Sequence, residues 1–488
     1  MSETLIWSAV AFYLLVALGV AWYSRSGPAT DMADFFLGAR QMGGVLSALS
    51  YSATTYSAFM MVGLAGLTYA GGVGAFGFEI LYFAGVSLVA VFGPRFWAVG
   101  RHFGFVSPGE MLGARYESRA VAMAVTLASC LFLIPYAAVQ LAGVGYLLSG
   151  MSGDAISFTT GVAVATVLAL LFVWIAGIRS VMWTDALQAL FMIIASTLVT
   201  VLVVWQLGGP GALFERLAET RPEALSVPGG GTFSLINFLG LTLPWFFFSL
   251  SNPQVSQRLF MPRSLGAMRR MLLVFLLFGF VYTLVTVLWG FSALVAFPDL
   301  EAADLATPTL LASDYVPPLL GVIVMVGILA AAVSTIDSIM LTLASMVARD
   351  VRGATARSEK HQLATGKWVM PVIALLALAF AELQLDLIAV LSVAASSGLV
   401  VTVPAIVGAF FWRRGTAAGV LTSVGVAGAL VLLSFVTGFR PLGLPAGLWG
   451  LPLAALIFVL TSLATRAPEG AERFIRLSRE RPQAIRGR

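Results

Sequence analysis

Two acidic residues and a row of hydroxyls stand inside long apolar runs of the sequence. Asp185 lies early in the run 181–206, and Asp337 lies within the run 318–347. In the second run, one helical stripe at offsets of 0, 3, 4 and 7 consists of Ala331, Ser334, Thr335 and Ser338. Hydroxyl and carbonyl oxygens are hard ligands that suit a small hard cation. The sequence therefore indicates an oxygen-lined cation site among apolar helices.

The two acids need partners, because an ionisable side chain at bilayer depth costs about 2.5–3.5 kcal/mol on insertion scales. We place all 28 Lys and Arg residues in loops or at the ends of apolar runs, so the sequence offers the acids no basic partner inside a membrane. A bound cation or a proton is then expected. Two alternatives stay open: Asp185 could cap an interfacial helix near Arg179, and Asp337 could be a protonated acid hydrogen-bonded within the bundle.

Two apolar runs carry residues that weaken a helix. The run 45–69 contains hydroxyls where a lipid-facing anchor would carry Leu and Ile: Ser50, Ser52, Thr54, Thr55 and Ser57. The run 233–252 contains Pro244 and is followed by Pro253, and a proline removes a helical hydrogen bond and clashes with the preceding turn. Two interrupted segments five helices apart are typical of an inverted-repeat transporter with its site between them. A small-residue packing face or two unrelated kinked helices are the alternatives.

The composition is that of a helical membrane protein. Of 488 residues, 59% are hydrophobic and only 10% are charged, which excludes an ordinary soluble enzyme. We expect an all-α polytopic protein with one transmembrane domain over residues 1–465 and a basic tail over 466–488. The expected membrane spans cover roughly 5–23, 43–71, 74–97, 121–149, 156–176, 181–206, 233–252, 271–297, 318–347, 368–382, 386–412, 416–437 and 446–465.

The basic residues predict how the chain is oriented in the membrane. With an N-terminus outside, all but three of the 28 Lys and Arg fall on the cytoplasmic side; the exceptions are Arg216, Arg221 and Arg440. The sequence therefore predicts a multi-pass protein of the plasma membrane with a cytoplasmic C-terminus. Its tail is expected to lie next to lipid headgroups. We expect the lipid bilayer as partner, with no nucleic acid and no obligate protein partner.

Five motifs follow one another along the chain. They are Phe35-Phe36-Leu37-Gly38-Ala39-Arg40, the hydroxyl-rich stretch within 45–69, Trp183-Thr184-Asp185-Ala186-Leu187-Gln188, Asn252-Pro253-Gln254-Val255-Ser256-Gln257-Arg258, and Ala331-Ala332-Val333-Ser334-Thr335. In this order they resemble the sodium:solute symporter family of bacterial permeases and animal sodium–glucose transporters. The resemblance implies the LeuT-type fold: two inverted five-helix repeats, over about 43–206 and 233–412, with extra N- and C-terminal helices.

The resemblance also implies where sodium, the expected coupling ion, would bind. Carried over by position, the main site uses the carbonyls of Ala53, Tyr56 and Ala331 and the hydroxyls of Ser334 and Thr335. Some members bind a second sodium beside the acid of the TDxxQ motif. Its equivalent here consists of Asp185, Ser334, Asp337 and Ser338. Asp337 departs from the serine of that pattern, which either strengthens cation binding or favours a proton.

A substrate pocket is expected beside the two helix breaks. Its lining is predicted to be Phe59, Tyr136, Gln140, Trp245 and Ser249. Aromatic walls with a few polar groups suit a small, partly apolar organic solute. The span 121–149 is similar to the monocarboxylate and pantothenate branches. Thr55 replaces the acid of the proline-specific members, which argues against proline.

The sequence thus predicts a sodium-coupled importer of a small organic solute, with a monocarboxylate or a pantothenate-like anion as the first candidate. A sodium- or proton-coupled permease for a proline-like amino acid or a sugar is the alternative. A membrane-embedded solute sensor is the rival from another class. An enzyme is not expected, because both histidines, His102 and His361, fall in predicted cytoplasmic loops.

Overall fold

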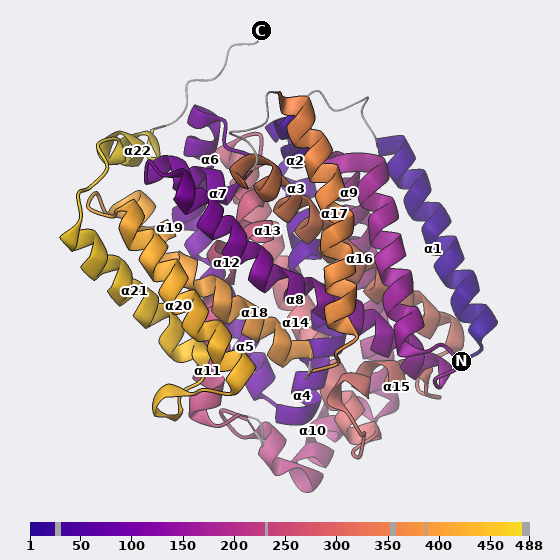
Figure 1. Cartoon of the computed structure of the whole chain (residues 1–488). Coiled ribbons are helices and arrows are strands. Elements are labelled where there is room, and N and C mark those ends of the chain that lie inside the picture. The colour runs from indigo at the N-terminus through magenta and orange to yellow at the C-terminus, as the bar shows by residue number, and fades with distance from the viewer. Residues whose placement is uncertain (25–30, 230–232, 352–357, 386–387, 481–488) are drawn as a thin grey trace.

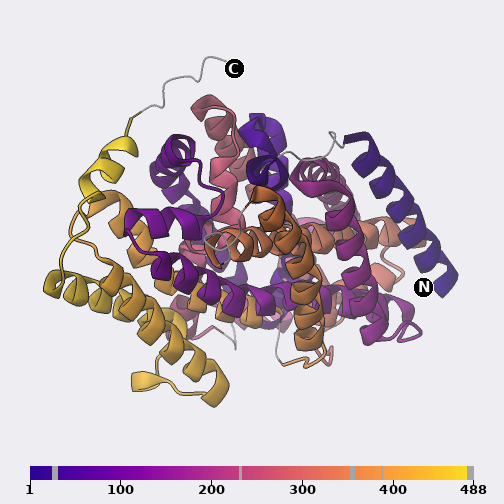
Figure 2. The same ribbon diagram turned by 45° about the horizontal axis from the view of Figure 1, so that its top comes forward.

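The molecule is a bundle of α-helices. A computed structural model of the chain describes residues 1–24, 31–229, 233–351, 358–385 and 388–480, apart from the side chains of residues 21, 24, 174–177, 179 and 180. Helix α1 (Glu3–Ser24) lies at one edge of the bundle, and α20 (Ala417–Thr437) and α21 (Ala446–Ala464) lie at the opposite edge (Figures 1 and 2). The helix α16 (Pro318–Met346), which holds the hydroxyl stripe, is among the most buried spans.

The expected membrane spans are present as helices. Among the described residues, ten helices are long and apolar enough to cross a membrane, and the three shorter apolar helices are Phe59–Gly71, Phe158–Val173 and Leu235–Phe246. Together they account for all the predicted spans. The long helices not yet named are α5 (Gly74–Val86) with α6 (Leu88–Phe103), α8 (Arg119–Ser152), α9 (Phe158–Gln206), α14 (Leu265–Ala296), α17 (Glu359–Ala381), and α18 (Ile388–Leu399) with α19 (Val403–Phe411).

One expected boundary is wrong. We predicted a loop between the spans 156–176 and 181–206, whereas α9 is helical without interruption from Phe158 to Gln206. The segment between the two spans contains Gly177 but no proline, and one glycine costs a helix only about 1 kcal/mol. Polar residues in this segment therefore do not end the helix, and α9 supplies both apolar spans from one element.

Both predicted helix breaks are confirmed. The first interrupted helix consists of α3 (Gly44–Thr55), a non-helical Tyr56-Ser57 step, the π-helix η2 (Phe59–Leu64) and α4 (Ala65–Gly71). The second consists of α11 (Leu235–Phe246), α12 (Phe248–Ser251) and α13 (Pro253–Ser256), with Asn252 in an extended conformation. The helix continues through Pro244, so the breaks fall after it, at Phe247 and Asn252.

Three short helices from segments expected on the cytoplasmic side lie at one end of the bundle. Helices α2 (Met32–Leu37), α7 (Pro108–Arg115) and α22 (Ala471–Leu477) share that end, and α10 (Gly209–Thr220) and α15 (Ala306–Ala312) lie at the other (Figure 1). The tail starts with α22, whose Phe474 ring stacks on Phe103; residues 481–488 of the predicted tail lie outside the described residues. The remaining short elements are η1 (Gly38–Arg40), η3 (Pro222–Leu225), η4 (Gln257–Phe260), η5 (Ala303–Leu305), η6 (Val347–Val351), η7 (Val400–Thr402) and η8 (Pro441–Gly443).

Gly85 of α5 allows α5 to approach the second break closely. A Cβ atom there would lie 1.8 Å from the carbonyl oxygen of Phe246, the last residue of α11. We therefore expect Gly85→Ala to lower the free energy of unfolding by about 1–3 kcal/mol, because it overpacks this contact. The measurement is thermal unfolding of the purified protein in detergent.

Gly425→Ala is the matched control for Gly85→Ala. Gly425 is also inside a helix, and a Cβ there meets no atom of the described chain within 4 Å. The control should keep or raise stability, by up to about 1 kcal/mol from helix propensity. Equal unfolding temperatures for the two variants would show that the α5–α11 contact does not constrain the fold.

Candidate functional site

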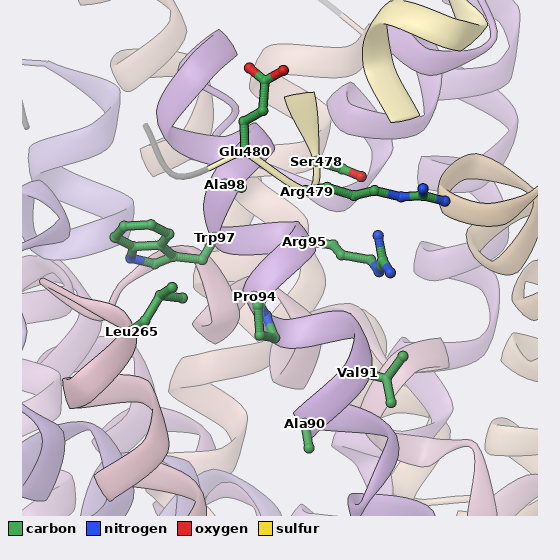
Figure 3. A pocket seen from close by; sticks show the side chains of 10 residues that line it. All are labelled: Ala90, Val91, Pro94, Arg95, Trp97, Ala98, Leu265, Ser478, Arg479 and Glu480. Carbon is green, nitrogen blue, oxygen red and sulfur yellow. The ribbon is translucent and has the colours of Figure 1, made fainter. Parts of the chain in front are cut away.

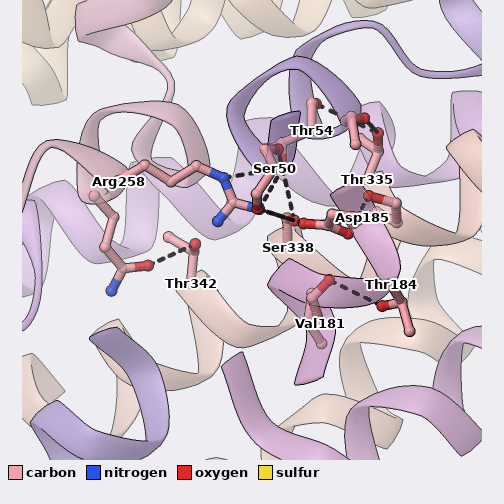
Figure 4. Close-up of polar contacts among 12 residues, drawn as sticks. Ser50, Thr54, Val181, Thr184, Asp185, Arg258, Thr335, Ser338 and Thr342 are labelled. Carbon is pink, nitrogen blue, oxygen red and sulfur yellow. Dashed lines mark hydrogen bonds and ion pairs between the residues drawn. The ribbon is translucent and has the colours of Figure 1, made fainter. Parts of the chain in front are cut away.

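The first helix break brings a hydroxyl of α16 against free carbonyls of α3. The Thr335 hydroxyl lies 3.2 Å from the carbonyl oxygen of Ala53, 3.3 Å from that of Thr54 and 3.1 Å from that of Ala331 (Figure 4). A hydroxyl has one proton, so it can donate fully to only one of these three acceptors. Thr335 is completely buried. The cluster is therefore rich in oxygen lone pairs and short of protons, as a cation site requires.

Tyr56 lies where the break releases a carbonyl. Its backbone is non-helical, with φ −92° and ψ 73°. In a continuous helix the N–H of Met60 would bond the Tyr56 carbonyl, but here it donates to the Ser57 carbonyl at 3.1 Å. Ser334, the remaining predicted ligand, points elsewhere: its hydroxyl donates to Asp185 Oδ1 at 2.5 Å. Of the predicted main site, the structure thus gathers Ala53, Ala331 and Thr335 around one point.

Asp185 of α9 is the centre of a second, adjoining cluster. Its carboxylate accepts hydrogen bonds from Ser50 of α3 at 2.6 Å and from Ser334 of α16 at 2.5 Å. Arg258 Nη2 lies 3.2 Å from Asp185 Oδ2, and both side chains are almost completely buried. The expectation that these acids have no basic partner inside the bundle is therefore wrong for Asp185. Three helical segments and one arginine meet at this carboxylate (Figure 4).

Arg258 reaches Asp185 because the segment that follows the second break stays buried inside the bundle. It belongs to η4, which follows Asn252 and α13 directly. The neighbouring Gln257 fixes this segment: its amide donates to the Val106 carbonyl at 2.8 Å and to Ser345 at 2.9 Å, and it accepts from Thr342 at 2.7 Å. Arg258, which we had placed in a loop or at the end of an apolar run, is thereby held in the interior of the bundle.

Ser338 and Asp337 are adjacent in sequence but differ in surroundings. The Ser338 hydroxyl accepts from Arg258 Nη2 at 2.7 Å and lies 3.0 Å from the Thr54 hydroxyl. Asp337 Oδ1 is buried without a hydrogen-bond partner among the described residues. Asp185, Ser334 and Ser338 therefore form one cluster. Among the described residues, no hydrogen bond joins Asp337 to it.

The predicted pocket residue Trp245 of α11 lies among other aromatic rings. The Trp245 ring centroid lies 4.9 Å from that of Phe59 and 4.6 Å from that of Phe248. The rings of Tyr136 of α8 and Phe248 have their centroids 5.9 Å apart. Gln140, one turn after Tyr136, is completely buried, and neither polar atom of its amide has a hydrogen-bond partner in the described part of the chain. A buried amide without a partner, one helical turn from Tyr136, is a group that a small solute would satisfy.

Ser249 of α12 lies near the same rings. Its hydroxyl is close to the hydroxyls of Tyr51 and Tyr82, without a hydrogen bond of good geometry to any described residue. The break between α11 and α12 places this hydroxyl four residues from Trp245, on a separate helical segment. It can therefore turn toward a ligand without disturbing a long helix.

Glu79 of α5 is a buried acid beside Trp245 that our sequence reasoning missed. It is buried, and its Oε2 accepts a hydrogen bond from Trp245 Nε1 at 3.3 Å. Glu79 was not among the residues that we predicted to line the pocket. The available signal was its position five residues inside an apolar helix, where an acid normally faces a polar interior.

Comparison with known proteins agrees with this arrangement. The sodium:solute symporter family model matches residues 35–427. The sodium/pantothenate symporter of Escherichia coli is 25% identical over 92% of this chain and 94% of its own length. A sodium/proline symporter of Staphylococcus aureus is 25% identical over 95% of this chain and 91% of its own length.

Solved structures share the fold. A Na⁺-coupled sialic acid symporter in a substrate-bound, outward-open state superposes with a TM-score of 0.79, at 18% identity, over 95% of this chain and 98% of its own. The nucleobase–cation-symport-1 transporter Mhp1 superposes with a TM-score of 0.58, at 13% identity, over 93% of this chain and 99% of its own.

A bundle with two broken helices and oxygen-rich clusters at the breaks is the LeuT-type fold of sodium-coupled solute transporters. The chain belongs to the sodium:solute symporter family. Its relatives are membrane transporters, and family and fold together support sodium as the coupling ion.

The buried pair of Asp185 and Arg258 generates a testable prediction. Removing one partner of a buried ion pair leaves the other charge without compensation, which costs about 3–5 kcal/mol. We expect Arg258→Gln and Asp185→Asn each to lower the unfolding temperature strongly. The double variant should lose less than the two single losses added together, since it buries no unpaired charge. Thermal unfolding of the three variants in detergent measures this coupling.

Arg413→Gln is the control for removing one positive charge. Arg413 pairs with Glu472 at 3.2 Å, but both side chains are about two-thirds exposed, so the change should cost less than about 1 kcal/mol. Strictly additive losses in the double variant would rule out the buried pair as a coupled unit.

Proposed function

We propose that this protein imports a small organic solute together with sodium by alternating access. The observation that carries the proposal is the Thr335 hydroxyl surrounded by three carbonyl oxygens at the break after α3. A cation held there bridges the broken helix to α16. Rocking of one group of helices against the other would break these contacts, so cation binding favours one orientation of the bundle.

We propose Ala53, Tyr56, Ala331, Ser334 and Thr335 as the sodium ligands of the main site. Ser334 would have to exchange its bond to Asp185 for the ion. The proposed second site is different, because Arg258 already supplies a positive charge to Asp185 and Ser338. While that pairing holds, the chain binds one sodium per cycle. Asp337, with an unpaired oxygen, is then the residue best suited to carry a proton.

One sodium is energetically sufficient for a neutral or zwitterionic solute. A potential of roughly 100 mV gives a charge about 2.3 kcal/mol, and a tenfold sodium gradient adds about 1.4 kcal/mol. Together these support accumulation of roughly several hundred-fold. Transport of a monoanion with one sodium moves no net charge, so the membrane potential does not drive it. The sodium gradient alone then supports about tenfold accumulation. Strong accumulation of an anion would therefore need a second cation.

For the substrate, we propose a hydroxylated or amide-bearing anion of the pantothenate kind rather than a simple monocarboxylate. Glu79 beside Trp245 is a hydrogen-bond acceptor that such hydroxyl or amide donors can meet. The unpaired Gln140 amide offers both a donor and an acceptor to the same molecule. The sodium/pantothenate symporter among the relatives is consistent with this choice.

A proline-like amino acid is the second candidate, and the same glutamate favours it. An ionised Glu79 would pair directly with a substrate ammonium group. The sodium/proline symporters among the relatives agree with this alternative. Against it, Thr55 replaces the acid that proline-specific members are expected to carry. The two candidates therefore differ in the substrate group beside Glu79, which is a neutral hydroxyl or amide in the first and an ammonium group in the second.

We also propose that the protein lies in the plasma membrane with its N-terminus outside. In support of this orientation, α2, α7 and α22, which lie in or next to the segments rich in Lys and Arg, share one end of the bundle (Figure 1).

Uptake into proteoliposomes tests the proposed function. Labelled pantothenate, pyruvate, lactate, proline and a sugar would be supplied with and without a sodium gradient, at fixed pH and voltage. We expect sodium-dependent accumulation of one solute, with a sodium Hill coefficient near one. Uptake driven by a pH gradient but indifferent to sodium would contradict sodium coupling and favour Asp337 as a proton carrier.

Thr335→Ala should raise the sodium concentration needed for half-maximal uptake by about tenfold or more, because it removes the hydroxyl at the centre of the carbonyl cluster. Thr166→Ala is the matched control: Thr166 is also buried and bonds its own helix, at the Val162 carbonyl, away from the site. Uptake as a function of sodium measures both. Unchanged sodium activation in Thr335→Ala, or an equal loss in the control, would count against the site.

Glu79→Gln separates the two substrate candidates. For an ammonium-bearing solute it removes the ion pair, and affinity should fall by about tenfold or more. For an anion it removes a repelling charge while keeping an acceptor oxygen, so affinity should hold or improve. Competition for uptake by pantothenate and by proline in both proteins gives the comparison. Identical competition profiles would show that Glu79 does not contact the solute.

A further inference from the structure

A second pocket lies far from the transport site, beside α6 at the end of the bundle that carries α22. It has a volume of about 400 Å³ and is bounded by α6 and by the segment that follows α22 (Figure 3). Arg95, Trp97 and Arg479 are its large polar and aromatic residues, and Ala90, Val91 and Pro94 form its apolar side. None of these residues belongs to the sodium or solute sites described above.

Arg95 brings unsatisfied donors to this pocket. Its guanidinium stacks on the Phe411 ring, 4.4 Å from the centroid. Its Nε and Nη1 atoms are buried and have no hydrogen-bond partner among the described residues. A buried donor without an acceptor costs free energy that a ligand oxygen would recover. The planar guanidinium donates in a fork that matches two oxygens of a phosphate.

Arg479 adds a second positive charge, and no ion pair among the described residues neutralises either arginine. The charges of Arg479 and Arg95 repel each other, and Figure 3 shows both guanidinium groups on the same side of the pocket. The carboxylate of Glu480 points away from them (Figure 3) and lies 3.6 Å from Arg476. The pocket is therefore positively charged and complementary to an anion.

The apolar side of the pocket indicates what kind of anion it takes. Helix α6 ends at Phe103 at the end of the bundle that carries α22, so Ala90, Val91 and Pro94 lie deeper in the membrane than Arg95. Ala90 and Val91 are exposed along this path. Trp97, whose Nε1 donates to the Pro262 carbonyl at 2.8 Å, takes the position typical of an aromatic at the membrane interface. A free phosphate would use only the upper part of such a site.

We propose that this pocket binds an anionic phospholipid, with its phosphodiester on Arg95 and Arg479 and an acyl chain along the apolar face of α6. Basic pockets between helices at the cytoplasmic side of membrane proteins bind such headgroups. The lipid joins α6 to the segment that follows α22, because its phosphate contacts one arginine from each. The site is independent of which solute the protein transports.

Native mass spectrometry of the full chain tests the proposal. The protein would be released from detergent in the presence of phosphatidylglycerol or phosphatidylcholine of the same chain length. We expect phosphatidylglycerol to be retained in preference. Its apparent affinity should fall by about fivefold for each change in Arg95→Gln and Arg479→Gln. Arg473→Gln, an exposed residue of α22 outside the pocket, is the matched control and should retain the lipid.

Three results would overturn the proposal. Equal retention of the two lipids would show that charge is not recognised. An equal loss in Arg473→Gln would show general attraction to the basic tail. Displacement by glycerol phosphate or inorganic phosphate at concentrations equal to the lipid would identify a site for soluble phosphate. Should Arg95→Gln fail to fold, Arg479→Gln alone decides, because Arg479 is exposed and its removal leaves no buried group unpaired.

Discussion

In the hydrocarbon of a bilayer, every backbone N–H and C=O must find its partner inside the protein, and the centre of this molecule depends on how that demand is met at two helix breaks. After α3, the Tyr56 carbonyl loses its helical donor because the Met60 N–H bonds Ser57 instead. The Thr335 hydroxyl of α16 meets two neighbouring carbonyls, of Ala53 and Thr54. It cannot satisfy both. The break is thus stable only with α16 packed against it, and it keeps unsatisfied oxygen where a cation would be most effective.

The buried charges of Asp185 and Arg258, like the backbone groups at the breaks, must find their partners inside the protein. Two buried charges repay their desolvation only if geometry and additional hydrogen bonds are good. Here Asp185 accepts from Ser50 and Ser334, and Arg258 donates to Ser338. These contacts join α3, α9, α16 and η4, which come from distant parts of the chain. A movement that separated any of these elements would expose an unpaired charge, so the cluster ties the two broken helices to α9 and α16.

The sequence allowed much of this fold to be predicted, because span length and hydropathy depend on local residues. The spans, both breaks and the hydroxyl stripe of α16 were read from such local signals. Arg258 could not be placed in this way, since its burial results from contacts with α3, α9 and α16 that only tertiary packing defines. Glu79 was missed for a similar reason: its contact with Trp245 joins residues 166 positions apart. The loop expected within α9 was an error of another kind, because polar residues were taken as a helix end although no proline or cap stops the helix there.

The buried acids differ in how well the protein satisfies them, and this difference bears on function. Asp185 has two hydroxyl donors and an arginine, which is nearly what a carboxylate can accept. Glu79 accepts one indole N–H, and Asp337 keeps an oxygen that no described residue bonds. A fully bonded acid has little to gain from a ligand, since the ligand would have to displace existing bonds. An underbonded acid gains the full interaction. By this criterion Asp185 organises the bundle, whereas Glu79 and Asp337 have capacity left for a solute and a proton.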